Sequence, residues 1–298
     1  PEAYDLYRKA ISGAPGARSA ALHRSNLASM LSEFSDVFAT MLSMTEQEVL
    51  DLAVKEEELA ADALPMKDAQ RRRYTLGISV QLAVRYDERH RVEDFERAVR
   101  LLEENLQAAD AESEAARYRL GIAWLWRMRA LHTLDPSDLT SAETAHRHAL
   151  DAYRGVPAQL EVHLKYGLAM VLRFSAEGWI VGGRPFTDAF VARYQEATEL
   201  YRWCALHADG LVQDRIRRAD AWAQAAARLQ NWPEALEAYR LAFSLVPLLA
   251  PQHLSRPDRE QLLTNLDGVA ADAAACALSM GDPYTALEFL ESGRGLFL

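Results

Sequence analysis

The residues best placed to do chemistry in this sequence are Cys204 and His207, in the segment YRWCALHA. On a helix, residues three apart occupy neighbouring positions of one face, so the imidazole is within reach of the thiol as a base. A helical cysteine among aromatic residues and leucines is, however, usually a buried small hydrophobe. We therefore expect Cys204 to pack, and an all-α enzyme that uses this region stays open as an alternative.

The other residues of chemical interest form no constellation. Cys276 lies in the run AAACALS, which favours packing. His146 and His148 are two positions apart, so on a helix they point in different directions and make no chelating pair. The glycine-rich segment 178–185 lacks both the Gly-Lys-Ser/Thr ending of a phosphate-binding loop and a strand before it. We predict no catalytic residue, no metal site and no cofactor.

Composition favours a folded, soluble chain. Half of its 298 residues are apolar and about a quarter are charged, which suffices for a large core. No apolar run reaches the length of a membrane-spanning helix, so no membrane contact is expected. The net charge of −10 argues against nucleic acid, whose binding needs clustered lysines and arginines. With only two cysteines, a disulfide framework is not expected, and a reducing, cytoplasmic location follows.

Helical periodicity runs through almost every segment, whereas the alternation of a strand is nearly absent. Glycine and proline fall mainly between the periodic stretches, as expected of helix ends. Three helix starts have recognisable caps: the capping box at 45–48, Asn231 before Trp232-Pro233, and Asp282 before Pro283. The sequence predicts an all-α fold of roughly a dozen helices joined by short turns.

Internal repetition narrows this prediction. The segment 219–247, ADAWAQAAARLQNWPEALEAYRLAFSLVP, resembles a tetratricopeptide repeat (TPR). Trp222 and Tyr239 would fill the space between one helical pair and the next. Small residues would let the two helices approach closely, namely Ala223, Ala226, Ala235 and Ala242. A similar scheme recurs between Ala273 and Leu290, after a proline-rich connection.

Earlier repeats are more degenerate and are marked by glycines. Gly77, Gly121 and Gly167 each lie in a first-helix context and are 44 and 46 residues apart. A glycine inside a helix costs about 1 kcal/mol relative to alanine, so its recurrence at one repeat position indicates close helix contact there. The expected second helices are Val92–Ala109, Leu139–Tyr153 and Phe186–His207.

We therefore expect a single right-handed α-solenoid of TPR-like helical hairpins over residues 1–298. It would comprise degenerate N-terminal hairpins (1–65), long-armed degenerate repeats (66–210), the well-matched unit (211–250) and a C-terminal unit (251–298).

The C-terminal part of the chain carries a narrower resemblance. It looks like the TPR region that immediately precedes the peptidase domain of CHAT-domain proteins, which are caspase-like cysteine peptidases. The residues that carry this resemblance are Leu254-Ser255-Arg256, Asp258-Arg259, Ala271 to Ala275, Gly281-Asp282-Pro283, Ala286-Leu287-Glu288, Leu290-Glu291 and Gly293-Arg294-Gly295.

The resemblance implies a non-catalytic solenoid that senses or holds a partner and controls a downstream peptidase domain in cis. In the family the catalytic histidine and cysteine belong to that domain, and no segment here matches it. The apolar ending, Leu296-Phe297-Leu298, fits this expectation because a solenoid normally closes with a polar outer face. A gene that stops at Leu298 would contradict it.

A partner-binding surface can be placed on the first helices. In the best-matched unit the groove-facing positions would be Arg217, Asp220, Gln224 and Arg228, which are polar and suited to a peptide. Earlier units place apolar residues there: Ile78 and Leu82, then Ile122, Leu125 and Trp126, then Leu168, Val171 and Leu172. An exposed apolar wall usually marks an interaction site. We expect this wall either to be covered by a partner or by other helices, or to be core because the degenerate repeats shift which face is buried.

Three functions remain in view. The first is the regulatory scaffold of a CHAT-type protease, and the second is a free-standing TPR adaptor that binds a peptide or helix. The third is the enzyme that would use Cys204. Fold alone does not choose between them.

Overall fold

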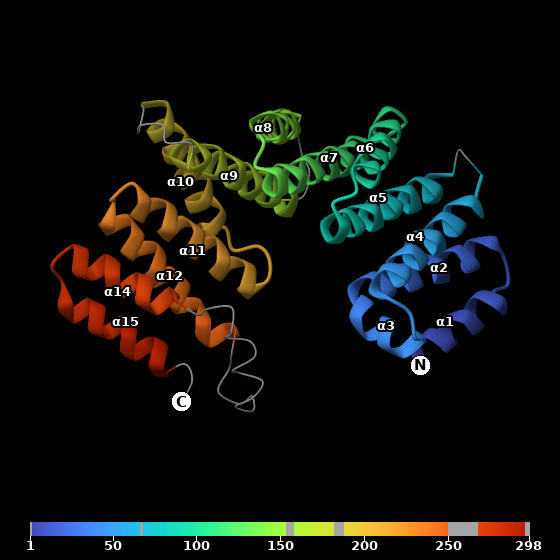
Figure 1. Cartoon of the computed structure of the whole chain (residues 1–298), viewed down its shortest axis with the longest axis horizontal. Helices are drawn as coiled ribbons and strands as arrows, with labels where there is room; N and C mark the ends of the chain where they lie inside the picture. Colours follow the sequence, from blue (N-terminus) through green and yellow to red (C-terminus); the bar gives the residue numbers. More distant parts are fainter. Residues whose placement is uncertain (1, 66–67, 153–157, 182–187, 250–267, 296–298) are drawn as a thin grey trace. The chain divides into compact units, whose positions relative to one another are not determined.

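The computed structural model describes residues 2–65, 68–152, 158–181, 188–249 and 268–295, and all regular structure in these ranges is α-helical (Figure 1). The predicted all-α fold is confirmed. The described helices are α1 (Glu2–Ser12), α2 (Ala17–Glu33), α3 (Ser35–Leu42), α4 (Glu46–Asp62), α5 (Ala69–Arg89), α6 (Val92–Gln107), α7 (Glu112–Thr133), α8 (Pro136–Asp151), α9 (Ala158–Val181), α10 (Asp188–Leu206), α11 (Val212–Arg228), α12 (Trp232–Leu249), α14 (Val269–Ser279) and α15 (Pro283–Gly295).

The chain divides into two compact units, of which the first comprises Pro1–His132 and Ala152–Val156 and the second comprises Thr133–Asp151 and Pro157–Leu298. Unit 1 contains α1 to α7 and unit 2 contains α8 to α15. Unit 1 has two buried apolar clusters, and unit 2 has a cluster of its own that extends from Leu168 to Phe289. A single solenoid over the whole chain stays a prediction, and each unit is described by itself.

Unit 2 is a succession of helical hairpins. Helix α9 pairs with α10, α11 with α12, and α14 with α15, while α10 packs on α11 and α12 packs on α14. Trp222 of α11 is fully buried, and its Nε1 donates a hydrogen bond of 2.8 Å to Glu234 of α12. The small residues predicted to let α11 and α12 approach are buried. This is the TPR-like arrangement expected from the sequence.

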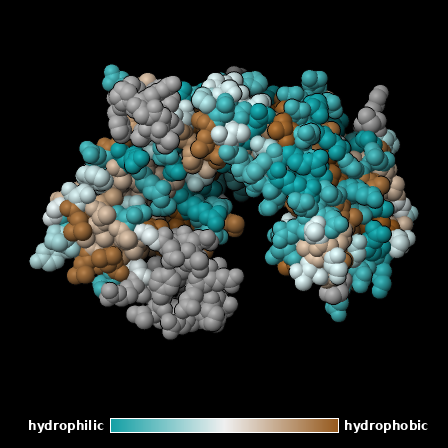
Figure 2. Space-filling model, in the orientation of Figure 1, coloured by the Kyte–Doolittle hydropathy of each residue, from teal (hydrophilic) through white to brown (hydrophobic). Residues whose placement is uncertain are grey.

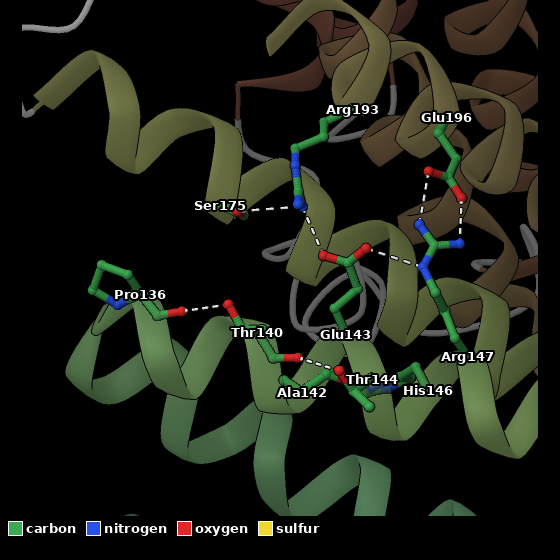
Figure 3. Close-up of polar contacts among 10 residues, drawn as sticks. All are labelled: Pro136, Thr140, Ala142, Glu143, Thr144, His146, Arg147, Ser175, Arg193 and Glu196. Atoms are coloured by element: carbon green, nitrogen blue, oxygen red, sulfur yellow. Dashed lines mark hydrogen bonds and ion pairs between the residues drawn. The ribbon is translucent and has the colours of Figure 1, made fainter. Parts of the chain in front are cut away.

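Helix α8 is attached to unit 2 by an ion-pair network (Figure 3). Arg147 of α8 forms a forked pair with Glu196 of α10, with N–O distances of 2.8 and 2.9 Å. Glu143, one turn earlier, accepts from both Arg147 and Arg193. Forked guanidinium–carboxylate pairs fix orientation better than single contacts do, so the network sets how α8 lies on α9 and α10.

The three recurring glycines lie where a first helix crosses the preceding helix. A Cβ atom on Gly77 of α5 would overlap the carboxyl group of Glu57 of α4, and one on Gly167 of α9 would overlap the His146 ring of α8. On Gly121 of α7 it would lie 3.1 Å from Cδ1 of Leu102 of α6. The close helix contact predicted from these glycines is confirmed at all three positions.

Local signals placed the helix ends well. The capping box at the start of α4 is present: Thr45 Oγ1 accepts from the Glu48 N–H, and the Thr45 N–H donates to Glu48 Oε2. Asp282 caps α15 by accepting from the Thr285 N–H at 3.1 Å. The side chain of Asn231 instead donates to Glu234. The three expected second helices correspond to α6, α8 and α10.

Helix α9 extends into the glycine-rich connection expected at 178–185, because it continues to Val181. The rest of that connection lies outside the described residues, as do Leu254, Arg256, Asp258 and Arg259 of the CHAT resemblance.

Helices α14 and α15 present apolar side chains to the surface, where Figure 2 shows hydrophobic residues gathered. The residues are Leu278 of α14 and Tyr284, Leu287 and Leu290 of α15, with Met280 between the two helices, and Tyr284 is 82% exposed.

In unit 1, the close contact between α5 and α4 at Gly77 buries the carboxyl group of Glu57. Glu57 is 2% exposed; its Oε1 accepts from the Ser25 hydroxyl at 2.9 Å, and its Oε2 is buried without a hydrogen-bond partner. Burial raises the pKa of Glu57 to about 7, against a small opposing effect of the Ser25 bond. The adjacent Glu56 differs, because it pairs with Arg8 and Arg24.

We predict that substituting the three glycines has unequal effects. Gly167→Ala should lower the stability of unit 2 by about 1–3 kcal/mol, since overpacking at a buried imidazole outweighs the gain in helix propensity. Gly121→Ala should be near neutral, because the Leu102 side chain can give way. Urea unfolding measures both. In a His146→Ala background the cost of Gly167→Ala should shrink, and an unchanged cost would contradict the contact assignment.

We also predict a pH-dependent stability of unit 1. Because the folded-state pKa of Glu57 lies above its ordinary value of 4.5, the unfolded chain releases this proton first as pH rises. Stability should therefore fall by about 3 kcal/mol between pH 4.5 and pH 7, at about 1.4 kcal/mol per pKa unit.

The Glu57→Gln variant should lose most of this pH dependence, whereas Glu58→Gln, at an exposed pair with Arg97, should keep it. The readout is hydrogen exchange of the α4 and α5 amides in a urea series. Equal pH profiles for the two variants would exclude Glu57 as the source.

Candidate functional site

The candidate site is a polar face on the first helices of unit 2. We call it the first-helix face and define it by the residues Arg173 and Glu177 of α9, Arg217, Asp220, Gln224 and Arg228 of α11, and Asp272 of α14. It contains all four α11 residues selected from the sequence.

The periodicity of α11 creates the middle of this face. Ala219, Trp222 and Ala226 are fully buried against α10 and α12. On the other side of the helix, Arg217, Gln224 and Arg228 are exposed. A helix with one apolar stripe buried must present its remaining side to solvent, so the packing itself orients these side chains outward.

Charged groups of three helices act on one another across the face. The charges of Asp272 on α14 and Arg173 on α9 both act on the carboxyl group of Asp220 on α11. Arg173 and Arg228 both act on Tyr194. The face is therefore one electrostatic unit that carries charges of both signs.

A layer of buried tyrosines lies beneath these charges. Tyr194, Tyr201 and Tyr239 are each 1% exposed, and burial raises the pKa of all three phenols. The Tyr194 hydroxyl donates to Glu177 at 2.5 Å. Because these rings are packed into the core, they hold the polar side chains above them on a rigid base.

Two residues of the face, Asp220 and Arg173, each have one buried atom without a hydrogen-bond partner, Oδ1 and Nε respectively. The Oδ2 atom of Asp220 accepts from Gln224 Nε2 at 2.9 Å. Burial raises the pKa of Asp220; the Gln224 bond and the Arg173 charge oppose the shift, and Asp272 adds to it. Within the described residues no cation lies within ion-pair distance of this carboxylate.

The apolar wall expected in the earlier units is core. Leu125 is 1% exposed and lies in a buried cluster of unit 1, so its side chain is not available to a partner. Trp126 is half-buried, with its ring centroid 5.0 Å from that of Phe95 on α6. The equivalent positions are also buried or half-buried, namely Ile78, Leu82, Ile122, Leu168, Val171 and Leu172. The degenerate repeats have shifted which face is buried.

A cleft of about 930 Å³ in unit 1, between α4, α5 and α6, is a weaker candidate. The arginines that line it are already neutralised. Arg71 binds Asp62, Arg72 binds Glu114 and Asp110, and Arg97 binds Glu58. Their pairing leaves little unsatisfied charge for a ligand.

The structure does not bring Cys204 and His207 together as nucleophile and base. Cys204 is fully buried, and its Sγ points to the Val162 carbonyl at 3.6 Å. The His207 ring stacks on Trp203, with centroids 4.5 Å apart, and faces Asp209. Burial raises the pKa of the Cys204 thiol to about 12, so the thiolate needed for attack is not formed near neutral pH.

Within the described ranges, no three histidine, cysteine or acidic side chains are grouped so as to hold a metal ion. Likewise, none of the helices described combines the length and apolar character needed to cross a membrane.

Sequence reasoning missed Arg173, Glu177 and Asp272. On α9 it selected the apolar residues Leu168, Val171 and Leu172 as groove positions, and these are buried. The available signal was the i, i+4 pair of Arg173 and Glu177, because it repeats the spacing of Asp220 and Gln224.

No family model matches the chain, and no curated protein matches it. Among solved structures, the crystal structure of BtubC (BKLC) from P. vanneervenii is 15% identical, with 84% of this chain and 89% of that chain covered and a TM-score of 0.48. The TPR2AB-domain:pHSP90 complex of yeast Sti1 is 13% identical, with 92% and 99% covered and a TM-score of 0.30. These values leave ligand and partner unassigned.

We predict that Cys204 is inert toward thiol reagents in the folded protein. A disulfide reagent at pH 8 should modify it only at the rate of unfolding, because its thiol is buried and protonated. The measurement is mass spectrometry of peptides at increasing urea concentration. Rapid labelling of Cys204 in native buffer would instead support the nucleophile hypothesis.

Proposed function

We propose that unit 2 binds a peptide or an exposed segment of a partner protein across the first-helix face, and that the chain acts as a non-catalytic interaction module. The observation that carries the proposal is the row of exposed polar side chains that α11 presents opposite its buried apolar stripe, namely Arg217, Gln224 and Arg228.

The chemistry of the face suits a polypeptide ligand. Arg173 and Arg228 offer N–H donors, and Glu177, Asp220 and Asp272 offer acceptors. A peptide main chain and its side chains supply both complements. Since these side chains stand on packed helices, little order has to be gained on binding, which favours affinity.

A finer proposal is that the bound partner or the chain itself controls a CHAT-type cysteine protease. Its support is the sequence resemblance alone, at 281–283, 286–288 and the neighbouring positions. The apolar row on α14 and α15 is compatible with a further domain but does not identify one.

The proposal is tested by selection from a random linear peptide library displayed on phage, with the intact chain as bait. We expect peptides whose affinity falls about tenfold or more in Arg228→Glu, equivalent to about 1.4 kcal/mol. Arg217→Glu should weaken the same peptides. The matched control is Arg240→Glu, a charge reversal at an exposed position of α12.

Fluorescence anisotropy of labelled peptides measures these affinities, and circular dichroism checks that each variant is folded. If no peptide is selected, or if Arg228→Glu and Arg240→Glu bind equally well, the first-helix face is not the binding surface.

A further inference from the structure

Arg218 of α11 is a buried cation without a carboxylate partner. The residue is 5% exposed, and within the described part of the chain its only hydrogen bond runs from Nη1 to the Asp209 carbonyl at 3.0 Å. In the same ranges no acidic side chain lies within ion-pair distance of the guanidinium. A buried charge is costly unless it is paired, so an anion beside Arg218 would be stabilising.

Arg218 lines a pocket of about 420 Å³ in unit 2, between the start of α9, the 209–211 connection and the start of α11. Its Nε and Nη2 atoms keep exposed surface, unlike the enclosed Oδ1 of Asp220. Gly210 leaves room beside them: at its φ of +107° a Cβ atom would lie 3.2 Å from Nη2. A ligand in the pocket can therefore reach the guanidinium.

The Nε and Nη2 atoms form the edge of a guanidinium that binds a carboxylate in a fork. Two other arginines of this chain use the same edge. Arg72 donates to the Glu114 carboxylate from Nε at 2.9 Å and from Nη2 at 3.3 Å, and Arg85 binds Asp94 through the same two atoms. On Arg218 this edge has no acceptor among the described residues, so a planar carboxylate is the group that fits it.

The backbone at the start of α11 adds to the attraction for an anion. Helix α11 begins at Val212, and Leu211 before it provides no side-chain cap. The first N–H groups of a helix carry a partial positive charge that favours anions.

Two acids that also line the pocket limit the charge of the ligand. Asp209 lies 3.4 Å from His207, and Asp214 lies 3.9 Å from Arg217. Because like charges repel over such distances, the pocket favours a ligand with a single negative charge over a phosphate dianion.

We propose that this pocket binds a small organic acid, whose carboxylate accepts from Nε and Nη2 of Arg218. The apolar part of the acid lies against Val162 and Leu211, which also line the pocket. A volume of this size suits a small molecule. None of the residues that define the first-helix face lines the pocket, so this site is separate from the proposed peptide surface.

Titration of the intact chain with benzoate tests the proposal, followed through the Arg218 Nε–H signal in ¹H–¹⁵N NMR. Benzoate should shift this signal in a saturable way, because its carboxylate accepts from that N–H. Benzamide has the same shape without the charge and should bind at least about tenfold more weakly, as should inorganic phosphate at pH 8. The carboxylate site is wrong if benzoate leaves the signal in place, or if benzamide or phosphate binds as well as benzoate.

A matched pair of variants gives a second readout. Arg218→Lys keeps the positive charge but removes the fork, so benzoate should bind about tenfold more weakly. Arg240→Lys, at an exposed position of α12, should bind benzoate as the unmodified chain does. Equal affinities of the two variants would contradict the role of Arg218. Circular dichroism checks the fold, and if Arg218→Lys does not fold, the comparison of benzoate with benzamide on the unmodified chain decides.

Competition distinguishes a small acid from a carboxylate of a bound polypeptide. Peptides selected for the first-helix face should leave the benzoate affinity unchanged. If these peptides displace benzoate, the pocket belongs to the peptide surface and the assignment to a small organic acid is wrong.

Discussion

The close crossing of each first helix over the preceding helix is the constraint on which this fold depends. At Gly77 of α5 and Gly167 of α9 a Cβ atom would overlap a side chain of the preceding helix, and at Gly121 of α7 it would lie 3.1 Å from the Leu102 side chain of α6. Helices this close bury their contact residues almost completely, as Leu82, Leu125 and Leu172 show. In the α11 and α12 pair, alanines serve the same purpose as the glycines.

The close crossing of the helices also determines which side chains of a first helix stay exposed to a ligand. A first helix that contacts both its hairpin partner and the preceding helix has only one strip left facing solvent. In α11 that strip carries Arg217, Gln224 and Arg228, with Asp220 at its edge. Binding chemistry on the first helices is therefore confined to a narrow row of side chains, which explains why a few polar residues dominate the candidate site.

Much of this architecture could be predicted from sequence because it depends on local signals. Caps such as Thr45 and punctuating glycines and prolines located the helices, and the repeated Gly77, Gly121 and Gly167 indicated the crossings. The exposed face of α7 and α9 could not be predicted in the same way. Both helices carry apolar residues on more than one side, so neighbouring helices decide that Leu125 and Leu168 are core. The unpartnered oxygen of Asp220 could not be predicted from the sequence either, because it depends on whether α9 and α14 supply a hydrogen-bond donor.

Because the two units have separate apolar clusters, a destabilising substitution in one unit acts mainly on the helices of that unit. In stacked hairpins each element is stabilised chiefly by its immediate neighbours, so the loss of one contact is felt locally. A destabilising substitution beside Gly77 would loosen the helices around α4 and α5, while the hairpins that carry Asp220 draw their stability from a different core. The loss of stability therefore depends on where along the chain a substitution lies. Each unit has its own free energy of unfolding, rather than one value for all 298 residues.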